Sequence, residues 1–333
     1  MPETSPRDLR LLPKAHLHLH FEESIRQTTL DEFALELGRP TPRMTDFTSF
    51  IEFDELCQAA VDVMRTPAHL IRMVGEMAED AAAQGCVWIE PAVWLPLHRS
   101  FIGADEQTLE ILIDASTTAT ARTGVGIGWI LAINRNESPA DAVVQARIAA
   151  RWEGRGVVGL GLHNDESRFP AADFVDAFAV IDGTGLLRTP HAGELAGPDS
   201  VRASIELLGA NRIQHGIRAI EDPAVVELVQ RRGVCLDVCP TSNVVLESVP
   251  SLADHPLPAL VEAGVAVSLN ADDPVNFGCD ILTEYELARD AFGFGPEILA
   301  NFARTSLMAS AAPQDTRDLG LPAIEAWLEG ARA

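Results

Sequence analysis

Apolar residues along this chain gather in short blocks separated by stretches with helical spacing. The blocks predict eight strands, near residues 15–21, 86–92, 125–133, 157–162, 187–192, 211–215, 234–239 and 265–271. Between most of them apolar residues recur at helical intervals, as in 73–85 and in 223–233, which has proline at its start and glycine at its end. Eight strands alternating with helices indicate an α/β fold with a parallel sheet closed into a TIM (β/α)8 barrel.

The connection between the first two predicted strands, residues 22–85, is unusually long for such a barrel. We expect extra helices in it, including one over 47–57, where apolar and aromatic residues have helical spacing. This helix would pack on the barrel rim, cover the pocket as a lid, or do both. The chain has no internal repeat or low-complexity segment. We therefore expect residues 1–333 to form a single barrel domain with a helical, lid-like insertion at 22–85.

The charge and composition of the chain exclude several classes of partner. The net charge of −24 disfavours a nucleic-acid groove and docking to anionic lipid. The longest apolar runs, such as 124–133, are too short to span a bilayer, and the first 14 residues hold no signal-peptide core. The five cysteines are scattered, without CxxC spacing, which favours a reduced cytoplasmic location. We expect a small-molecule substrate, and a homo-oligomer remains possible.

The stretch 16-HLHLHFEES-24 places three histidines at alternate positions of the first predicted strand. Alternate residues of a strand share a face, so His16, His18 and His20 point one way and Leu17 and Leu19 the other. At about 3.3 Å per residue, the first and last histidines lie about 13 Å apart, too far to share one metal ion. Barrel active sites lie at the C-terminal strand ends. We therefore expect His18 and His20 to bind a metal, and His16 to be a hydrogen-bonded interior residue.

Three further strand ends carry residues suited to metal or acid–base chemistry. His191 and Glu194 lie in TPHAGE, His215 in RIQHG, and Asp272 and Asp273 in SLNADDP. Taken alone, the two aspartates could form a solvated turn or helix cap before a proline. Adjacent ionised carboxylates at a barrel mouth are costly unless a cation or a substrate uses them. Because these aspartates and the histidines all lie at predicted strand ends, we favour one site that they share.

These motifs, with PKAHLHLHF and CPTSN, resemble in order and spacing those of the adenosine deaminase family of metal-dependent aminohydrolases, over roughly residues 11–310. The forms PKAHLHLHF and PHAGEL are similar to those of actinobacterial-type members. The resemblance implies a (β/α)8 hydrolase that deaminates a 6-aminopurine nucleoside, of the adenosine or deoxyadenosine type, to the 6-oxo product and ammonia. It also implies that CPTSN has a structural role, tying the seventh strand to its neighbours.

The resemblance also implies roles for the strand-end residues. One zinc ion would be held by His18, His20, His191 and Asp272. Glu194 would donate a proton to a purine ring nitrogen, and His215 would orient or deprotonate the attacking water. Asp273 would hydrogen-bond the attacking oxygen or the purine. His20, Glu22, Asn164 and Asp273 would contact the substrate.

The chemistry of a zinc aminohydrolase suits these residue types. Zinc lowers the pKa of a bound water to about 7, and a partly buried carboxylic acid can protonate the ring. His and Asp ligands also accept iron and manganese, so the metal remains open. Lys14 is the only lysine, and no predicted strand end carries one. A binuclear centre bridged by a carboxylated lysine is therefore disfavoured.

The sequence departs from the family pattern in the region expected to contact substrate. Glu22 matches an acid that in family members lies near the sugar of the substrate. Glu23 stands where family members have a small residue, and it is either a solvated surface charge or part of the pocket mouth. Asn164 stands where a glycine approaches the purine, although asparagine tolerates positive φ. The two glutamates disfavour phosphorylated substrates. Free adenine, or a modified 6-amino nucleoside such as aminodeoxyfutalosine, is the alternative substrate. A more remote alternative is that the protein is a non-catalytic relative that binds a nucleoside.

Overall fold

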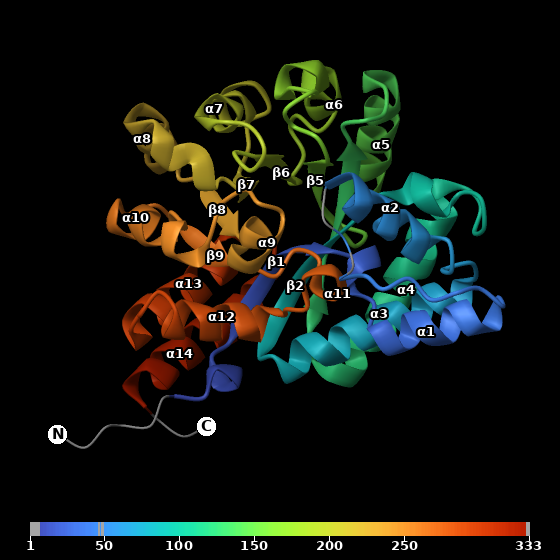
Figure 1. The fold of residues 1–333 in the computed structure, drawn as a ribbon, viewed down its shortest axis with the longest axis horizontal. Coiled ribbons are helices and arrows are strands. Elements are labelled where there is room, and N and C mark those ends of the chain that lie inside the picture. The colour runs from blue at the N-terminus through green and yellow to red at the C-terminus, as the bar shows by residue number, and fades with distance from the viewer. Residues whose placement is uncertain (1–6, 46, 48–49, 331–333) are drawn as a thin grey trace.

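Parallel strands close into a barrel in the computed structural model, which describes residues 7–45, 47 and 50–330 (Figure 1). The strands run in the order β1-β2-β4-β5-β6-β7-β8-β9, and the short β3 pairs with β2. Their bounds are β1 Lys14–His20, β2 Cys86–Val93, β3 Gly126–Ile127, β4 Trp129–Asn134, β5 Val157–His163, β6 Leu187–Ala192, β7 Arg212–His215, β8 Cys235–Val238 and β9 Val267–Leu269. The predicted (β/α)8 barrel is confirmed.

The barrel closes where the chain leaving β9 meets β1. The Asp272 N–H donates to the His18 carbonyl at 3.1 Å, and the His20 N–H donates to the Asp272 carbonyl at 3.1 Å. A parallel bridge between Leu19 and Asp272 lies at the same place. Closure therefore brings two of the predicted metal ligands beside the acidic pair.

The predicted strand 125–133 is two strands, which corrects the sequence interpretation. β3 ends at Ile127 and β4 begins at Trp129. The indole ring of Trp88 lies against Gly126 of β3 and against Gly128, the residue between the two strands. A Cβ on Gly126 would lie 2.4 Å from this ring, and a Cβ on Gly128 would lie 2.7 Å from it. The break therefore accommodates a large buried ring, which apolar periodicity alone does not indicate.

Helices surround the barrel (Figure 1). The long first connection holds α1 Gln27–Glu36, α2 Phe50–Val61 and α3 Pro67–Ala83, as expected for extra helices there, although residues 48 and 49 of the predicted 47–57 helix lie outside the described residues. The others are α4 Asp105–Thr123, α5 Pro139–Trp152, α6 Val175–Ala179, α7 Pro198–Leu207, α8 Pro223–Arg232, α9 Pro240–Val245, α10 Leu257–Glu262, α11 Pro274–Phe277, α12 Ile281–Asp290, α13 Pro296–Ala309 and α14 Gln314–Glu329. Among the described residues, no helix combines the length and apolar character needed to cross a bilayer.

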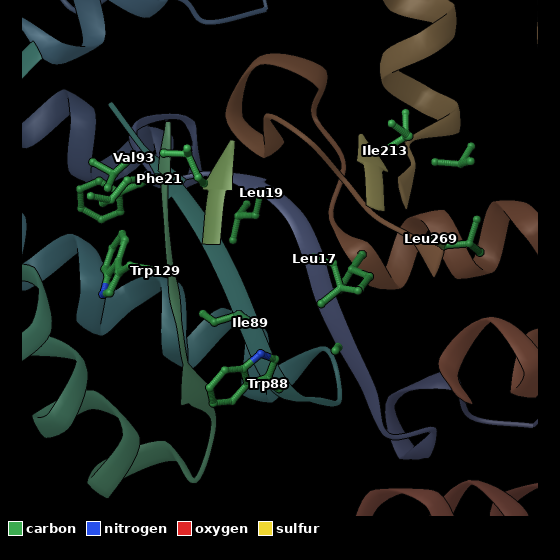
Figure 2. Close-up of a cluster of buried hydrophobic side chains, with 14 of the residues drawn as sticks. Leu17, Leu19, Phe21, Trp88, Ile89, Val93, Trp129, Ile213 and Leu269 are labelled. Atoms are coloured by element: carbon green, nitrogen blue, oxygen red, sulfur yellow. The ribbon is translucent and has the colours of Figure 1, made fainter. Parts of the chain in front are cut away.

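The apolar core lies between the strands and the helices. Leu17 and Leu19 of β1 are buried on the outward face, in one cluster with Ile89 and Trp129 of neighbouring strands (Figure 2). Burying each such side chain contributes roughly 1.5–3 kcal/mol, so the register of β1 is strongly specified. A slip of one residue would turn the histidines outward. The alternation in HLHLH thus fixes which face of the strand enters the barrel.

The barrel floor holds a buried ion network. The Arg212 guanidinium lies 2.6 Å from Glu90 and 2.8 Å from Asp237, and the Trp88 indole N–H donates to Glu90 at 2.8 Å. All three charged side chains are almost completely buried. Because removing one partner would leave a buried charge unpaired, this network holds β2, β7 and β8 in fixed register.

Lys14 lies at the N-terminal start of β1, away from the strand ends that form the site. Its ammonium donates to the carbonyls of Leu9 at 2.9 Å and Gln84 at 2.7 Å. Burial lowers the pKa of this amine to about 8. The single lysine is thus engaged at the opposite end of the strand from the metal-type residues, in agreement with the expectation that it bridges no metals.

Candidate metal and catalytic site

A cavity of about 350 Å³ lies at the C-terminal ends of the strands. Each predicted site residue except His18 lines it, and His18 lies directly beneath as a completely buried residue. Helix α2 of the long connection contributes part of the wall. The lining includes His20, Glu22, Asn164, His191, Glu194, His215, Asp272 and Asp273 from the strand ends, and Phe53, Cys57, Gln58 and Val61 from α2.

The predicted metal ligands gather around Asp272, with His18, His191 and His215 in one cluster and His20 with Asp273 in another. His18 Nε2 lies 3.1 Å from His191 Nε2 and 2.9 Å from Asp272 Oδ1, and His20 Nε2 lies 3.1 Å from the same carboxylate oxygen. Zinc–ligand bonds of about 2.0–2.1 Å in a tetrahedron place neighbouring ligand atoms about 3.3 Å apart. These spacings therefore suit one small metal ion.

A hydrogen bond of His18 shows which of its ring nitrogens faces the other metal-type residues. Its Nδ1 lies 3.1 Å from the Asp237 carbonyl, which can only accept, so Nδ1 carries a proton and Nε2 faces His191 and Asp272. Asp272 Oδ1 is buried and lies 2.9 Å from His18 Nε2 and 3.1 Å from His20 Nε2, while its other oxygen accepts from Ser242 at 2.7 Å. Two imidazole nitrogens gathered on one buried carboxylate oxygen are a ligand set that fits a metal cation.

His16 has a structural role. Its Nε2 accepts the backbone N–H of Ala271 at 3.1 Å, deep in the barrel. Burial lowers its pKa to about 3, so the ring is neutral. The expectation of a hydrogen-bonded interior histidine is confirmed.

A chain of hydrogen bonds fixes which nitrogen of His215 carries the proton. The Leu257 N–H donates to His255 Nδ1 at 3.0 Å, so the His255 proton is on Nε2. That N–H faces Asn243 Oδ1 at 3.2 Å, which orients the amide and points its NH2 group at His215 Nδ1, 3.0 Å away. Nδ1 of His215 is therefore the acceptor, and its proton resides on Nε2.

The protonated nitrogen of His215 faces the acidic residues of the site. Nε2 lies 3.5 Å from Glu194 Oε2 and 3.6 Å from Asp272 Oδ2. Although His215 groups with the metal-type residues by distance, its lone pair is already used by Asn243. Its geometry suits a hydrogen-bond donor beside the metal rather than a ligand.

Two carboxyl groups of the cavity are held toward their protonated forms. Burial raises the pKa of Glu194 well above its usual 4.5, and the charges of Asp272 and Glu166 raise it further. Burial, and then the charge of Asp272, raise the pKa of Asp273 in the same way. Glu194 Oε1 is buried and has no partner among the described residues. It is therefore available to donate to a ligand in the cavity.

The two glutamates after β1 are both buried in the wall of the cavity. Glu22 lies 2.8 Å from His98 Nε2, and both side chains are almost fully enclosed. Glu23 is only 7 % exposed, so the interpretation as a solvated surface charge is wrong. Helix α2 covers it, and burial followed by repulsion from Glu22 raises its pKa to about 7.

The cavity contains strained backbone. Positive φ angles occur at Asn164 (76°), His215 (66°) and Asp272 (62°), and these residues all line the cavity. Residues other than glycine adopt this region rarely, and such strain gathers at functional sites. Asn164 thus keeps the glycine-like conformation that the sequence comparison anticipated for this position.

Sequence reasoning missed several residues that contact the site. CPTSN was interpreted as structural, yet Ser242 bonds Asp272 and Asn243 bonds His215. His163 at the end of β5 also lines the cavity, with its ring 4.6 Å from that of His20 and with a buried Nε2 that has no hydrogen-bond partner among the described residues. The sequence signal that could have identified these residues is their position at or just after the end of a strand.

The sequence model of the adenosine deaminase family matches residues 13–325. The chain belongs to the adenosine deaminase family. A Streptomyces coelicolor relative, provisionally named adenosine/adenine deaminase, is 43% identical over 97% of this chain and 98% of its own. An aminodeoxyfutalosine deaminase of Acidothermus cellulolyticus is 32% identical over 90% of this chain and 88% of its own.

Solved structures agree with this family membership. The crystal structure of an adenine deaminase from Arthrobacter aurescens superposes with a TM-score of 0.89 at 29% identity, covering 96% of this chain and 99% of that one. Family members are hydrolases of C–N bonds in small purines, and this chain is such a hydrolase. The buried histidine and aspartate cluster fits their metal site.

Proposed function

We propose that this protein is a zinc-dependent deaminase of a 6-aminopurine nucleoside, which yields the 6-oxo product and ammonia. The observation that carries the proposal is the position of Glu194. Its Oε1 has no hydrogen-bond partner among the described residues, and Glu194 lines the same cavity as His191 and Asp272, whose side chains lie 3.1 and 2.9 Å from His18 Nε2. A proton donor is of no use to a protein that only binds nucleosides, so this arrangement supports catalysis.

The ligand set that we propose is His18, His20, His191 and Asp272. His18 donates from Nδ1 to the Asp237 carbonyl, so its Nε2 faces His191 and Asp272, and His191 is neutral because burial lowers its pKa. When bound, zinc lowers the pKa of a water molecule so that hydroxide is available at neutral pH. His215 is left out of the set because Asn243 occupies its lone pair.

The residues around this centre would have separate roles in proton transfer and hydrogen bonding. Glu194, protonated in its buried setting, donates to a ring nitrogen, so that the ring can accept electrons when C6 is attacked. His215 presents an N–H that orients the attacking oxygen. Asp273, also held toward its protonated form, hydrogen-bonds that oxygen or the purine. The leaving ammonia takes its proton through the same group of residues.

The charge of the cavity wall bears on the substrate. The described lining residues include Glu22, Glu23 and Glu137 but no lysine or arginine. A phosphate would meet like charges there and no counter-charge. We therefore place adenosine and deoxyadenosine ahead of their nucleotides. Free adenine is the second candidate, because the Arthrobacter aurescens relative is an adenine deaminase.

The direct test is ammonia release from a panel of adenosine, deoxyadenosine, adenine, AMP and modified 6-amino nucleosides by the zinc-loaded protein. We expect turnover of the uncharged purines and little turnover of AMP. Release from adenine alone would move the assignment to the base. Stoichiometric zinc with no ammonia from any member would contradict the proposed function.

A further inference from the structure

Glu166 is a buried carboxylate to which the proposed chemistry gives no direct role beyond the effect of its charge on the pKa of Glu194. It lies just beyond β5 and is 4 % exposed. Its two oxygens accept the N–H groups of four consecutive residues, 193–196, at 2.9, 2.6, 2.6 and 3.0 Å. The Ser200 hydroxyl donates to it as well. Five donors thus reach this one carboxylate, and four of them come from one short segment.

The segment 193–196 is shaped to receive an anion. It begins at Gly193 with φ +67°, and a Cβ there would lie 2.5 Å from the Val201 side chain. Successive N–H groups that turn inward after a left-handed residue form an anion-binding nest. In the described part of the chain, no lysine or arginine forms an ion pair with Glu166, although Arg135 and Arg218 lie near enough to interact with its charge. The direct contacts to the carboxylate are the charge-assisted hydrogen bonds from the nest and Ser200.

The segment held in this way carries Glu194. The Glu194 N–H is one of the four donors, at 2.6 Å from Glu166 Oε1. Arg218 holds the opposite side of the segment, donating from its backbone to the Gly193 carbonyl at 3.0 Å and from its side chain to Leu195. The backbone of Glu194 is thus fixed from both sides, while its carboxyl stays free to face the cavity.

We propose that Glu166 is a positioning residue, whose carboxylate holds the nest 193–196 so that the Glu194 side chain meets the substrate in one orientation. The proposal rests on the proposed function for its catalytic part. Whether Glu166 holds the segment 193–196 is tested separately, by a measurement that needs no activity. A misplacement of about 1 Å at a reacting group costs on the order of 100-fold in rate.

The kinetic test uses Glu166→Gln in two backgrounds, wild type and Glu194→Gln. In the wild-type background we expect kcat to fall about 10- to 100-fold, with KM changed less than about threefold and zinc content unchanged. In the Glu194→Gln background the same substitution should change the residual kcat less than about twofold, because residues that act as a unit are non-additive. Ser200→Ala, which removes one of the five donors, should show the same pattern more weakly.

The second measurement is amide hydrogen exchange, which needs no activity. In Glu166→Gln, the peptide covering 193–196 should exchange at least about tenfold faster, whereas α8 should keep wild-type protection. Unchanged exchange in 193–196 would overturn the proposal, as would an equal fall of kcat in both backgrounds or a loss explained entirely by lost zinc. If the wild type releases no ammonia, the proposed function fails, and the exchange result still decides whether Glu166 holds the segment.

Discussion

The side-chain amide of Asn243 lies 3.0 Å from Nδ1 of His215, and the His255 contact on its other side fixes the direction of this amide. The consequence is a neutral imidazole with its proton on Nε2, facing Glu194 and Asp272. The family resemblance left open whether this histidine orients or deprotonates the attacking water. The hydrogen-bond chain favours orientation.

Substitution of Asn243 tests this assignment. In Asn243→Asp the carboxylate accepts a proton from Nδ1 and leaves Nε2 as a lone pair. We expect kcat to fall on the order of 10²–10³-fold, since a wrong histidine tautomer is costly in other hydrolases. Nitrogen-15 NMR of the labelled imidazoles should show the His215 proton on Nε2 in wild type and on Nδ1 in the variant. A wild-type proton on Nδ1 would refute the assignment.

The different roles of His16 and His18 predict different metal contents for variants at these two positions. His18→Gln removes a proposed ligand, and we expect metal content to fall at least about tenfold. His16→Gln keeps an acceptor near the Ala271 N–H and should bind metal as wild type does. Metal would be measured by mass spectrometry on the folded fraction of each protein. Equal loss in both variants would show that the row of histidines binds metal differently.

Glu284 predicts a pH dependence of stability. Its carboxyl is completely buried, and burial raises its pKa from 4.5 to about 7. The native state therefore binds more protons than the unfolded state between these values, so this group makes stability fall as pH rises from 4.5 to 7. Glu284→Gln removes that loss and should stabilise the protein at pH 8 by about 3 kcal/mol.

The matched measurement for Glu284 is the denaturant midpoint of wild type and variant at pH 5 and pH 8. The difference between the two proteins should be small at pH 5 and large at pH 8. A difference that is the same at both pH values would mean that Glu284 does not titrate in this range.

The acidic cavity wall predicts selection against phosphorylated substrates. Glu137 is an exposed residue of this wall, outside the proposed catalytic set. Glu137→Lys should raise kcat/KM for AMP relative to adenosine by about five- to tenfold at low ionic strength, and less in salt. Glu110→Lys makes the same charge change on α4, outside the cavity, and should leave the ratio unchanged. Equal effects of the two variants would assign the selection to net charge alone.

The sequence predicted the parts of the site that local patterns determine. Alternation in HLHLH sets the inward face of β1, and strand ends of a barrel meet at one mouth, so His191, His215 and Asp272 were found without coordinates.

Other features depend on contacts between distant segments. The burial of Glu23 results from α2 lying over it, and the tautomer of His215 results from α9 and the chain before α10. The break between β3 and β4 depends on the ring of Trp88 from another strand. No periodicity along the chain records such contacts, although CPTSN marked one of the segments involved.

The most direct test of the central claim is ammonia release by the zinc-loaded protein beside its Glu194→Gln variant. The account predicts that the wild type deaminates adenosine or a close 6-aminopurine, and that the variant keeps its zinc but loses at least about 10²-fold in kcat, as expected for removal of a general acid. A variant that holds zinc and turns over as fast as the wild type would contradict the account.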